Sequence, residues 1–190
     1  MINFSPRVWH GREAHEMQDL LFKDRLIFIN TDIEPEVSLA ICQQIMVLNQ
    51  QDAERPIKLH LLSPGGSVNC ALAIVDTMRT LSCPVETTVM GIAASAAALI
   101  LSAGAKGGRR ATQYSRIMIH EIASKTEGKL SVMLDSIKEV QVLDEVLNTM
   151  LSLFTGKSRE EIEKCIRKDY YMSATEAKDF GLIDEVIAWK

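Results

Sequence analysis

Apolar and polar positions follow two periods along the chain, and these periods predict alternating strands and helices. Short runs rich in Ile, Leu and Val are typical of buried strands, and they lie at 25–30, 57–62 and 84–90. Apolar residues at steps of three and four predict helices, at 35–50, 67–81 and 94–103. Repeated strand–helix–strand units indicate an α/β fold.

A long amphipathic helix dominates the second half. It runs from Leu130 to about residue 155, and its apolar side chains recur at steps of three and four. One core does not need a helix of this length, so we expect it to offer a surface to a partner subunit. Short strands at 110–113 and 116–120 precede it. After it the pattern predicts a helix opened by Ser158 and Glu161, an extended piece at 170–172, a helix opened by Ser173 and Glu176, and a strand at 182–188.

The first dozen residues show no period and contain Pro6 and Gly11, which predicts an irregular N-terminal arm over 1–12. A short helix over Glu13–Lys23 is expected next. No linker or repeat interrupts the remainder, so residues 13–190 are expected to form a single domain.

Composition and charge limit the partners that we expect for this protein. The 190 residues carry 21 basic and 25 acidic side chains, a net charge of −4, so we expect no nucleic-acid partner. The longest uncharged apolar stretch, 91–105, is shorter than the roughly 20 residues that cross a bilayer, so no membrane association is expected. The four cysteines have no CxxC spacing, which is typical of reduced thiols in the cytoplasm.

Ser95 is the first candidate for chemistry. It lies between a predicted strand and a predicted helix, with Ala93 and Ala97 two positions to either side. A nucleophile on a sharp strand-to-helix turn needs small residues at these positions. A serine at a helix start is more often an ordinary N-cap, and the pattern leaves both interpretations open.

Two further segments could assist such a serine. The turn Ser63–Ser67 contains Gly65 and Gly66, whose backbone amides could approach an oxyanion or a phosphate, although an ordinary tight turn has the same sequence. His120 ends a predicted strand, where a scaffold can present a catalytic group. Asp169 has a suitable position for orienting a histidine, but it is one of 25 acidic residues. No metal site and no cofactor are expected, because no second His or Cys stands at ligand spacing.

Several segments in one order resemble the Clp protease proteolytic subunit (ClpP) family, over nearly the whole chain. They are LFKDRLIFI, SPGGSV, AIVDTM, GIAAS, AGAKGGR, SRIMIH, FTGKSREEIE and DYYMSATEAKDFGLIDEV. The resemblance implies the crotonase-like α/β fold, in which a spiral of βαβ units forms a head and a long helix, here about 130–155, forms a protruding handle.

The resemblance also implies a function and its residues. The family nucleophile falls on Ser95, the general base on His120 and the acid on Asp169, while the oxyanion amides fall on Gly66 and Ala96. Such a chain would be a self-compartmentalising serine endopeptidase subunit that cleaves unfolded polypeptides and peptides inside a chamber. Two stacked heptameric rings would form that chamber, and an ATP-dependent AAA+ unfoldase would feed it.

This sequence departs from the family pattern near those residues. Ala96-Ala97 replaces Met-Gly, Glu121-Ile122 replaces Gln-Pro, and Arg167-Lys168 replaces an acidic-Arg pair. These departures indicate a divergent paralogue, for which partnership with a second ClpP subunit is an option. The alternative function is a weakly active or structural ring subunit that modulates an active paralogue. An acyl-CoA enzyme of the same fold is disfavoured, because such enzymes usually use an acidic catalytic residue.

Overall fold

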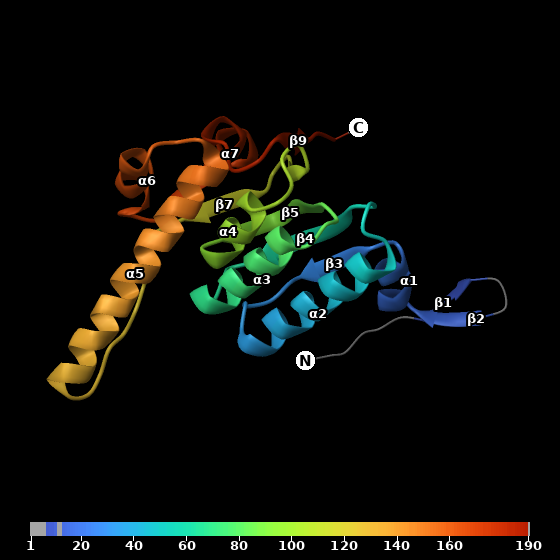
Figure 1. Cartoon of the computed structure of the whole chain (residues 1–190). Coiled ribbons are helices and arrows are strands. Elements are labelled where there is room, and N and C mark those ends of the chain that lie inside the picture. Colours follow the sequence, from blue (N-terminus) through green and yellow to red (C-terminus); the bar gives the residue numbers. More distant parts are fainter. Residues whose placement is uncertain (1–6, 11–12, 190) are drawn as a thin grey trace.

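A seven-stranded sheet forms the centre of the fold (Figure 1). The computed structural model describes residues 7–10 and 13–189. Along the sheet the strands follow the order β3-β4-β5-β6-β9, and β7 pairs with both β5 and β8. The elements are β1 (Arg7–His10), β2 (Glu13–Glu16), α1 (Met17–Lys23), β3 (Leu26–Ile29), α2 (Pro35–Gln51), β4 (Ile57–Ser63), α3 (Val68–Thr80), β5 (Val85–Ala94), α4 (Ala96–Ser102), β6 (Arg109–Thr112), β7 (Arg116–Ile119), α5 (Leu130–Thr155), α6 (Arg159–Ile166), β8 (Tyr170–Ser173), α7 (Ala174–Phe180) and β9 (Glu185–Ile187).

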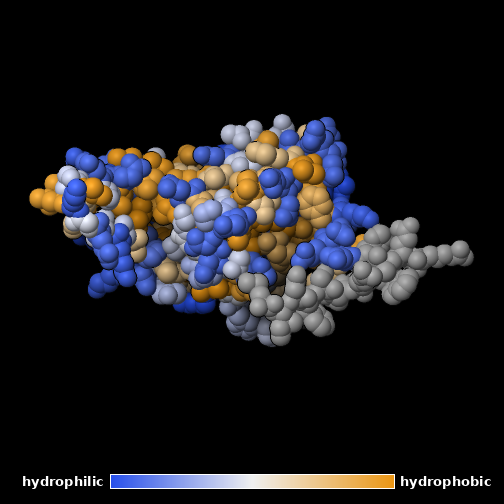
Figure 2. Space-filling model, turned by 90° about the horizontal axis from the view of Figure 1, so that it is seen from below, coloured by the Kyte–Doolittle hydropathy of each residue, from blue (hydrophilic) through white to orange (hydrophobic). Residues whose placement is uncertain are grey.

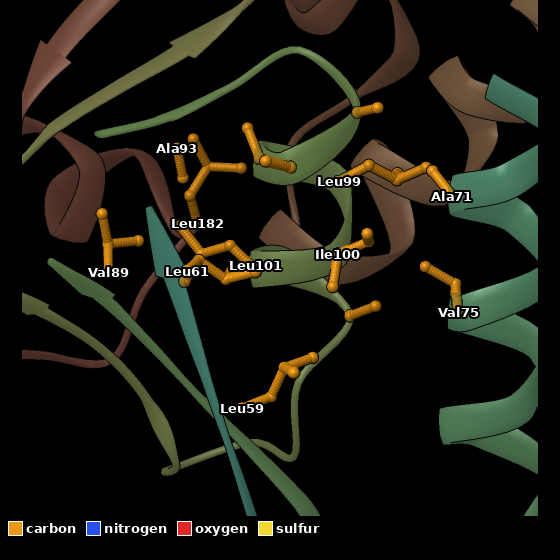
Figure 3. Packing of buried hydrophobic residues seen from close by; sticks show 14 of the residues in the cluster. Leu59, Leu61, Ala71, Val75, Val89, Ala93, Leu99, Ile100, Leu101 and Leu182 are labelled. Carbon is orange, nitrogen blue, oxygen red and sulfur yellow. The ribbon is translucent and has the colours of Figure 1, made fainter. Parts of the chain in front are cut away.

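Strands β3, β4, β5, β6 and β9 pair in parallel, as the α/β prediction requires. Helix α4 is buried on every side, which explains its continuous apolar sequence. It presents Leu101 toward Leu61 of β4 and Leu99 toward Ala71 of α3 (Figure 3). The aliphatic core therefore holds the start of α4, and with it Ser95, against both the sheet and α3.

Strand β5 changes its partner half-way along. Its first half pairs with β6 through Thr87–Val89, and its second half pairs with β7 through Ile92–Ala94. Gly91 lies at the change with φ +89°, a conformation that glycine adopts at little cost. Ser115 holds the junction, since its Oγ accepts from the Gly91 N–H and donates to the Val89 carbonyl, each at 3.1 Å. As a result the last residues of β5 run beside β7.

Helix α5 has 26 residues and projects from the body (Figure 1). At 1.5 Å per residue it is about 39 Å long. Its two buried residues, Asn148 and Leu151, both lie in its C-terminal half. Figure 2 shows apolar residues at the left-hand end of the molecule, where α5 projects. The exposed apolar residues of this helix are Leu130, Val132, Leu134, Ile137, Val142, Val146 and Leu153.

The predicted start of the chain was wrong in two places. Arg7–His10 forms β1 and pairs antiparallel with β2, so this part of the arm is regular. The helix begins at Met17 rather than Glu13, because Glu13–Glu16 is β2. Only Gly11 and Arg12 separate these strands in the sequence, and a short glycine-containing link is a hairpin signal that an apolar period does not reveal. The rest of the predicted arm, residues 1–6 and 11–12, lies outside the described residues.

The remaining predicted elements are confirmed, with small shifts of their ends. Strand β5 continues to Ala94, four residues beyond the prediction, and β9 is limited to Glu185–Ile187. Both predicted capping boxes, at Ser158 and Ser173, are present with reciprocal hydrogen bonds. The four cysteines are free and pack in or against the core.

A buried ion pair fixes the end of the chain to the sheet. Arg109 is 5% exposed, and its Nε donates to Asp184 Oδ2 at 3.0 Å. The same guanidinium also donates to the carbonyls of Phe154 and Gly181, at 2.9 Å each. Burial alone raises the pKa of Asp184, but the hydrogen bonds from the side chain and backbone of Arg109 outweigh it, so this pKa lies below its ordinary value.

We predict that Asp184→Asn lowers the free energy of unfolding by about 3 kcal/mol at pH 7, because it leaves Arg109 buried without its counter-charge. A carboxyl group with a depressed pKa stabilises the fold above its unfolded pKa and loses that effect as pH falls through the folded pKa. The difference between wild type and variant should therefore shrink below about pH 4. Urea unfolding from pH 7 to pH 3 measures it. Glu185→Gln is the matched control, since that carboxylate is 59% exposed in its pair with Arg110. Equal losses in both variants would contradict the prediction.

Candidate active site

Ser95 occupies a strained turn between β5 and α4. Its φ of 54° and ψ of −124° are rare for a residue other than glycine, and such strain is concentrated at functional sites. Its N–H donates to the Met118 carbonyl of β7 at 2.8 Å, which holds the turn in place. The Ser95 side chain makes no capping hydrogen bond, and N-cap residues normally have extended φ and ψ. The ordinary N-cap interpretation is therefore wrong.

His120 follows β7 directly and faces Ser95. The parallel register pairs Ala94 with Met118, so the residues just beyond these two strand ends come together. The His120 Nε2 lies 2.8 Å from the Ser95 Oγ, which is hydrogen-bond distance. This contact joins residues that are 25 positions apart in the sequence.

Asp169 is the third predicted residue, and it lies near the second ring nitrogen of His120, Nδ1. It immediately precedes β8, whose antiparallel register pairs Ile119 with Tyr170. The distance from His120 Nδ1 to Asp169 Oδ1 is 3.5 Å, longer than a good hydrogen bond, and the Asp169 side chain is 59% exposed. Helix α6 stops at Ile166, so Asp169 lies in the link between α6 and β8.

The glycine turn after β4 packs against Ser95. A Cβ at Gly65 would lie 2.7 Å from the Ala94 carbonyl oxygen and 2.8 Å from the Ser95 Cβ, so only glycine fits at this approach. Ser63 Oγ supports the turn by accepting from the Gly65 N–H at 3.1 Å and donating to the Thr31 carbonyl at 2.6 Å. The turn is therefore built for a close contact with the serine.

Two backbone amides beside Ser95 are left out of regular hydrogen bonding. In the bridge between Ile33 and Gly66, the bonds run from Ile33 N–H to Gly65 and from Ser67 N–H to Ile33, so the Gly66 amide is not used. Ala96 is the first residue of α4, and the first amides of a helix have no intrahelical partner. These are the two amides expected for an oxyanion site.

A cavity of about 160 Å³ opens beside these groups. Its lining includes Gly66, Ser95, Ala96 and His120, and most of the other lining residues are aliphatic. The full lining is Gly66, Val68, Ala71, Ser95, Ala96, Leu99, Ile119, His120, Glu121, Ile122, Ala123, Asp144, Leu147, Asn148, Leu151 and Ile166. Asp169 approaches His120 from outside this cavity.

The sequence analysis did not predict that α5 contributes residues to the cavity. Asp144 and Asn148 line it, and Asn148 is 3% exposed. Their spacing of four puts both on one face of the helix. In the sequence, Asn148 directly follows the apolar Leu147 of the long amphipathic helix. A polar residue next to the apolar stripe was the only sign in the sequence that this part of the helix could contribute to a site.

Comparison with known protein families identifies the family of the chain. The sequence model of the family described as Clp protease matches residues 10–190 of the chain. This chain belongs to the Clp protease family. Clp proteases are serine peptidases. The mixed α/β structure, with a central sheet and seven helices over residues 7–10 and 13–189, has the predicted ClpP fold. Within the described residues, no helix is long and apolar enough to cross a membrane.

We predict that Gly65→Ala destabilises this Clp protease chain by about 1–3 kcal/mol more than Gly107→Ala does. Both glycines have positive φ, +108° and +84°, so both variants incur backbone strain. Only at Gly65 does the new methyl group also meet backbone atoms, because nothing lies within 4 Å at Gly107. Urea unfolding of the two variants measures the difference. Equal losses would show that the turn can move away from Ser95.

Proposed function

We propose that this chain is a serine endopeptidase with Ser95 as nucleophile, His120 as general base and Asp169 as the residue that orients the imidazole. The observation that carries the proposal is the 2.8 Å contact between Ser95 Oγ and His120 Nε2 on a strained turn. A nucleophile and a base within hydrogen-bond reach are the signature of covalent acyl transfer. The phosphate-binding alternative for the glycine turn has no comparable support.

The steps follow from the geometry. His120 Nε2 takes the proton of Ser95 Oγ as the oxygen attacks a peptide carbonyl, and then passes that proton to the leaving amine. The negative charge that develops on the carbonyl oxygen meets the amides of Gly66 and Ala96, and one such donor is worth about 3–4 kcal/mol. His120 then takes a proton from water, which hydrolyses the acyl-enzyme and frees Ser95.

Substrate would bind as an extended peptide between two segments. The stretch after the glycine turn and the stretch after His120 both border the cavity, through Gly66, Val68, Glu121, Ile122 and Ala123. Residues 120–126 form no regular strand. The Glu121 N–H already donates to the Ile166 carbonyl at 2.9 Å, so an added peptide strand would pair with the main-chain groups that follow it.

The assembly that we propose is a pair of stacked heptameric rings enclosing the active sites. Members of the Clp protease family form oligomeric rings. The exposed apolar stripe of α5 is the surface of this chain best suited to contact a second subunit, since such patches mark interaction sites. An AAA+ unfoldase would supply unfolded polypeptide in the cytoplasm.

One observation favours a second candidate, a weakly active or structural ring subunit that modulates an active ClpP paralogue. The His120–Asp169 distance of 3.5 Å and the 59% exposure of Asp169 leave the imidazole loosely oriented. Contact with another subunit could complete this arrangement. The two candidates differ in whether the chain alone carries an activated serine.

We predict one covalent adduct per chain when the assembled protein is treated with a fluorophosphonate, because the base His120 activates Ser95. Intact-mass spectrometry measures it. The adduct should disappear in Ser95→Ala and persist in Ser82→Ala, a substitution of an exposed serine outside the cavity. A wild-type ring that takes up no label would favour the second candidate.

We predict that Asp169→Asn lowers kcat for peptide hydrolysis by about 10–10²-fold, less than Ser95→Ala does. General acid–base catalysis contributes about 10²–10⁴-fold, and the 3.5 Å contact gives Asp169 only part of the control over His120. Steady-state kinetics on a fluorogenic peptide measure it. Asp179→Asn, another carboxyl group that lies outside the cavity, is the control. An unchanged kcat would remove Asp169 from the proposed site.

A further inference from the structure

The cavity beside Ser95 has one polar wall, which α5 contributes. Asn148 and Asp144 lie one helical turn apart there, and the Asn148 Nδ2 donates to Asp144 Oδ2 at 3.0 Å. This bond orients the amide, because a carboxylate only accepts hydrogen bonds and must face the NH₂ group.

The orientation leaves a buried acceptor without a donor. The Oδ1 of Asn148 has no hydrogen-bond partner among the described residues, although Asn148 is only 3% exposed. Buried polar atoms in proteins are nearly always partnered. Asn148 lines the cavity, so its unpartnered oxygen lies on the wall where a donor from a substrate side chain would bind.

The charges around the cavity have the same sign. Asp144 and Glu121 are the acidic residues that line it, and no lysine or arginine is among its described lining residues. Asp144 is half-buried and forms no ion pair within the part of the chain that the structure describes. A cation that enters the cavity would meet acceptors and no resident competitor.

Shape and polarity together fit a long basic side chain. A cavity of about 150 Å³ can hold a group the size of benzene, and this one has about 160 Å³. Its aliphatic walls, which include Val68, Leu99 and Leu151, suit the methylene stem of a lysine. The lysine ammonium carries three donors for the carboxylate and the amide oxygen.

We propose that Asp144 and Asn148 are specificity-determining residues that select a basic side chain, lysine or arginine, on the acyl side of the cleaved bond. The proposal rests on the function proposed above, since it takes Ser95 as the attacking group. The side chain that enters the cavity belongs to the residue before the scissile bond, because Ser95, His120 and the amides of Gly66 and Ala96 border the same cavity.

The test uses the assembled full chain and three fluorogenic peptides that differ only in the residue before the reporter: lysine, Nε-acetyl-lysine or leucine. We expect kcat/KM to be at least about tenfold higher for lysine than for either neutral residue, because a hydrogen bond to a charged group can supply such a factor. Acetylation keeps the stem and removes the charge, so the wild type alone tests the role of the carboxylate.

Variants locate the effect. Asp144→Asn should bring the lysine-to-leucine ratio close to unity, and Asn148→Leu should lower it as well. Glu145→Gln removes a charge from the neighbouring, exposed position of α5 and should leave the ratio unchanged. If Asp144→Asn does not fold, the comparison of lysine with acetyl-lysine in the wild type still decides.

Two failures can be told apart. A wild type that takes up fluorophosphonate but cleaves after leucine or acetyl-lysine as well as after lysine would overturn the selectivity alone. The same holds if Asp144→Asn keeps the wild-type ratio. A wild type that takes up no label and cleaves no peptide would overturn the proposed function and the selectivity with it.

Discussion

The change of partner in β5 at Gly91 is the constraint on which the site depends. If β5 continued beside β6, its end would have no strand from which a histidine could reach Ser95. Because the second half of β5 turns to β7, the Ser95 N–H bonds to the Met118 carbonyl and His120 follows one step beyond. Ser115, 1% exposed, holds β5 at this change through its hydrogen bonds to Gly91 and Val89. The geometry of the serine–histidine pair is therefore set by backbone pairing rather than by side-chain choice.

The two ladders of strand β7 position His120 relative to both Ser95 and Asp169. Its parallel register with β5 brings His120 to Ser95, and its antiparallel register with β8 brings Asp169 to the same imidazole. A slip of one residue in either ladder would turn the side chain to the opposite face of the sheet. The buried residues Ile117 and Ile119 of β7, which are 0% and 2% exposed, resist such a slip, because it would move them out of the core.

The sequence predicts most of the fold because its signals are local. The capping boxes at Ser158 and Ser173 connect residues three apart, and the strands and helices follow from apolar periods. The position of Ser95 was also visible, since small neighbours mark a tight turn. The residues themselves did not single out Asp169 among 25 acidic side chains, because its contact depends on β7–β8 pairing between residues at least 51 positions apart, the distance from Ile119 to Tyr170. Only the family resemblance singled it out. The β1–β2 hairpin and the polar wall formed by Asp144 and Asn148 were not predicted either. A pattern of apolar residues gives no signal for polar residues on a buried face.

The packing of α4 stabilises the strained turn at Ser95. A residue held in a sparsely populated region costs about 1–3 kcal/mol, whereas each fully buried Leu or Ile side chain contributes about 1.5–3 kcal/mol. Leu99, Ile100 and Leu101 are all buried, so α4 supplies more than enough to hold the turn. The turn that carries Ser95 is thus held by the buried residues of α4. Helix α5 meets the cavity beside this turn through residues of its C-terminal half, which include its buried Asn148 and Leu151, and otherwise projects away (Figure 1). In the function proposed above, the reacting groups lie at the ends of sheet strands, whereas the residues proposed to set the substrate preference lie on α5.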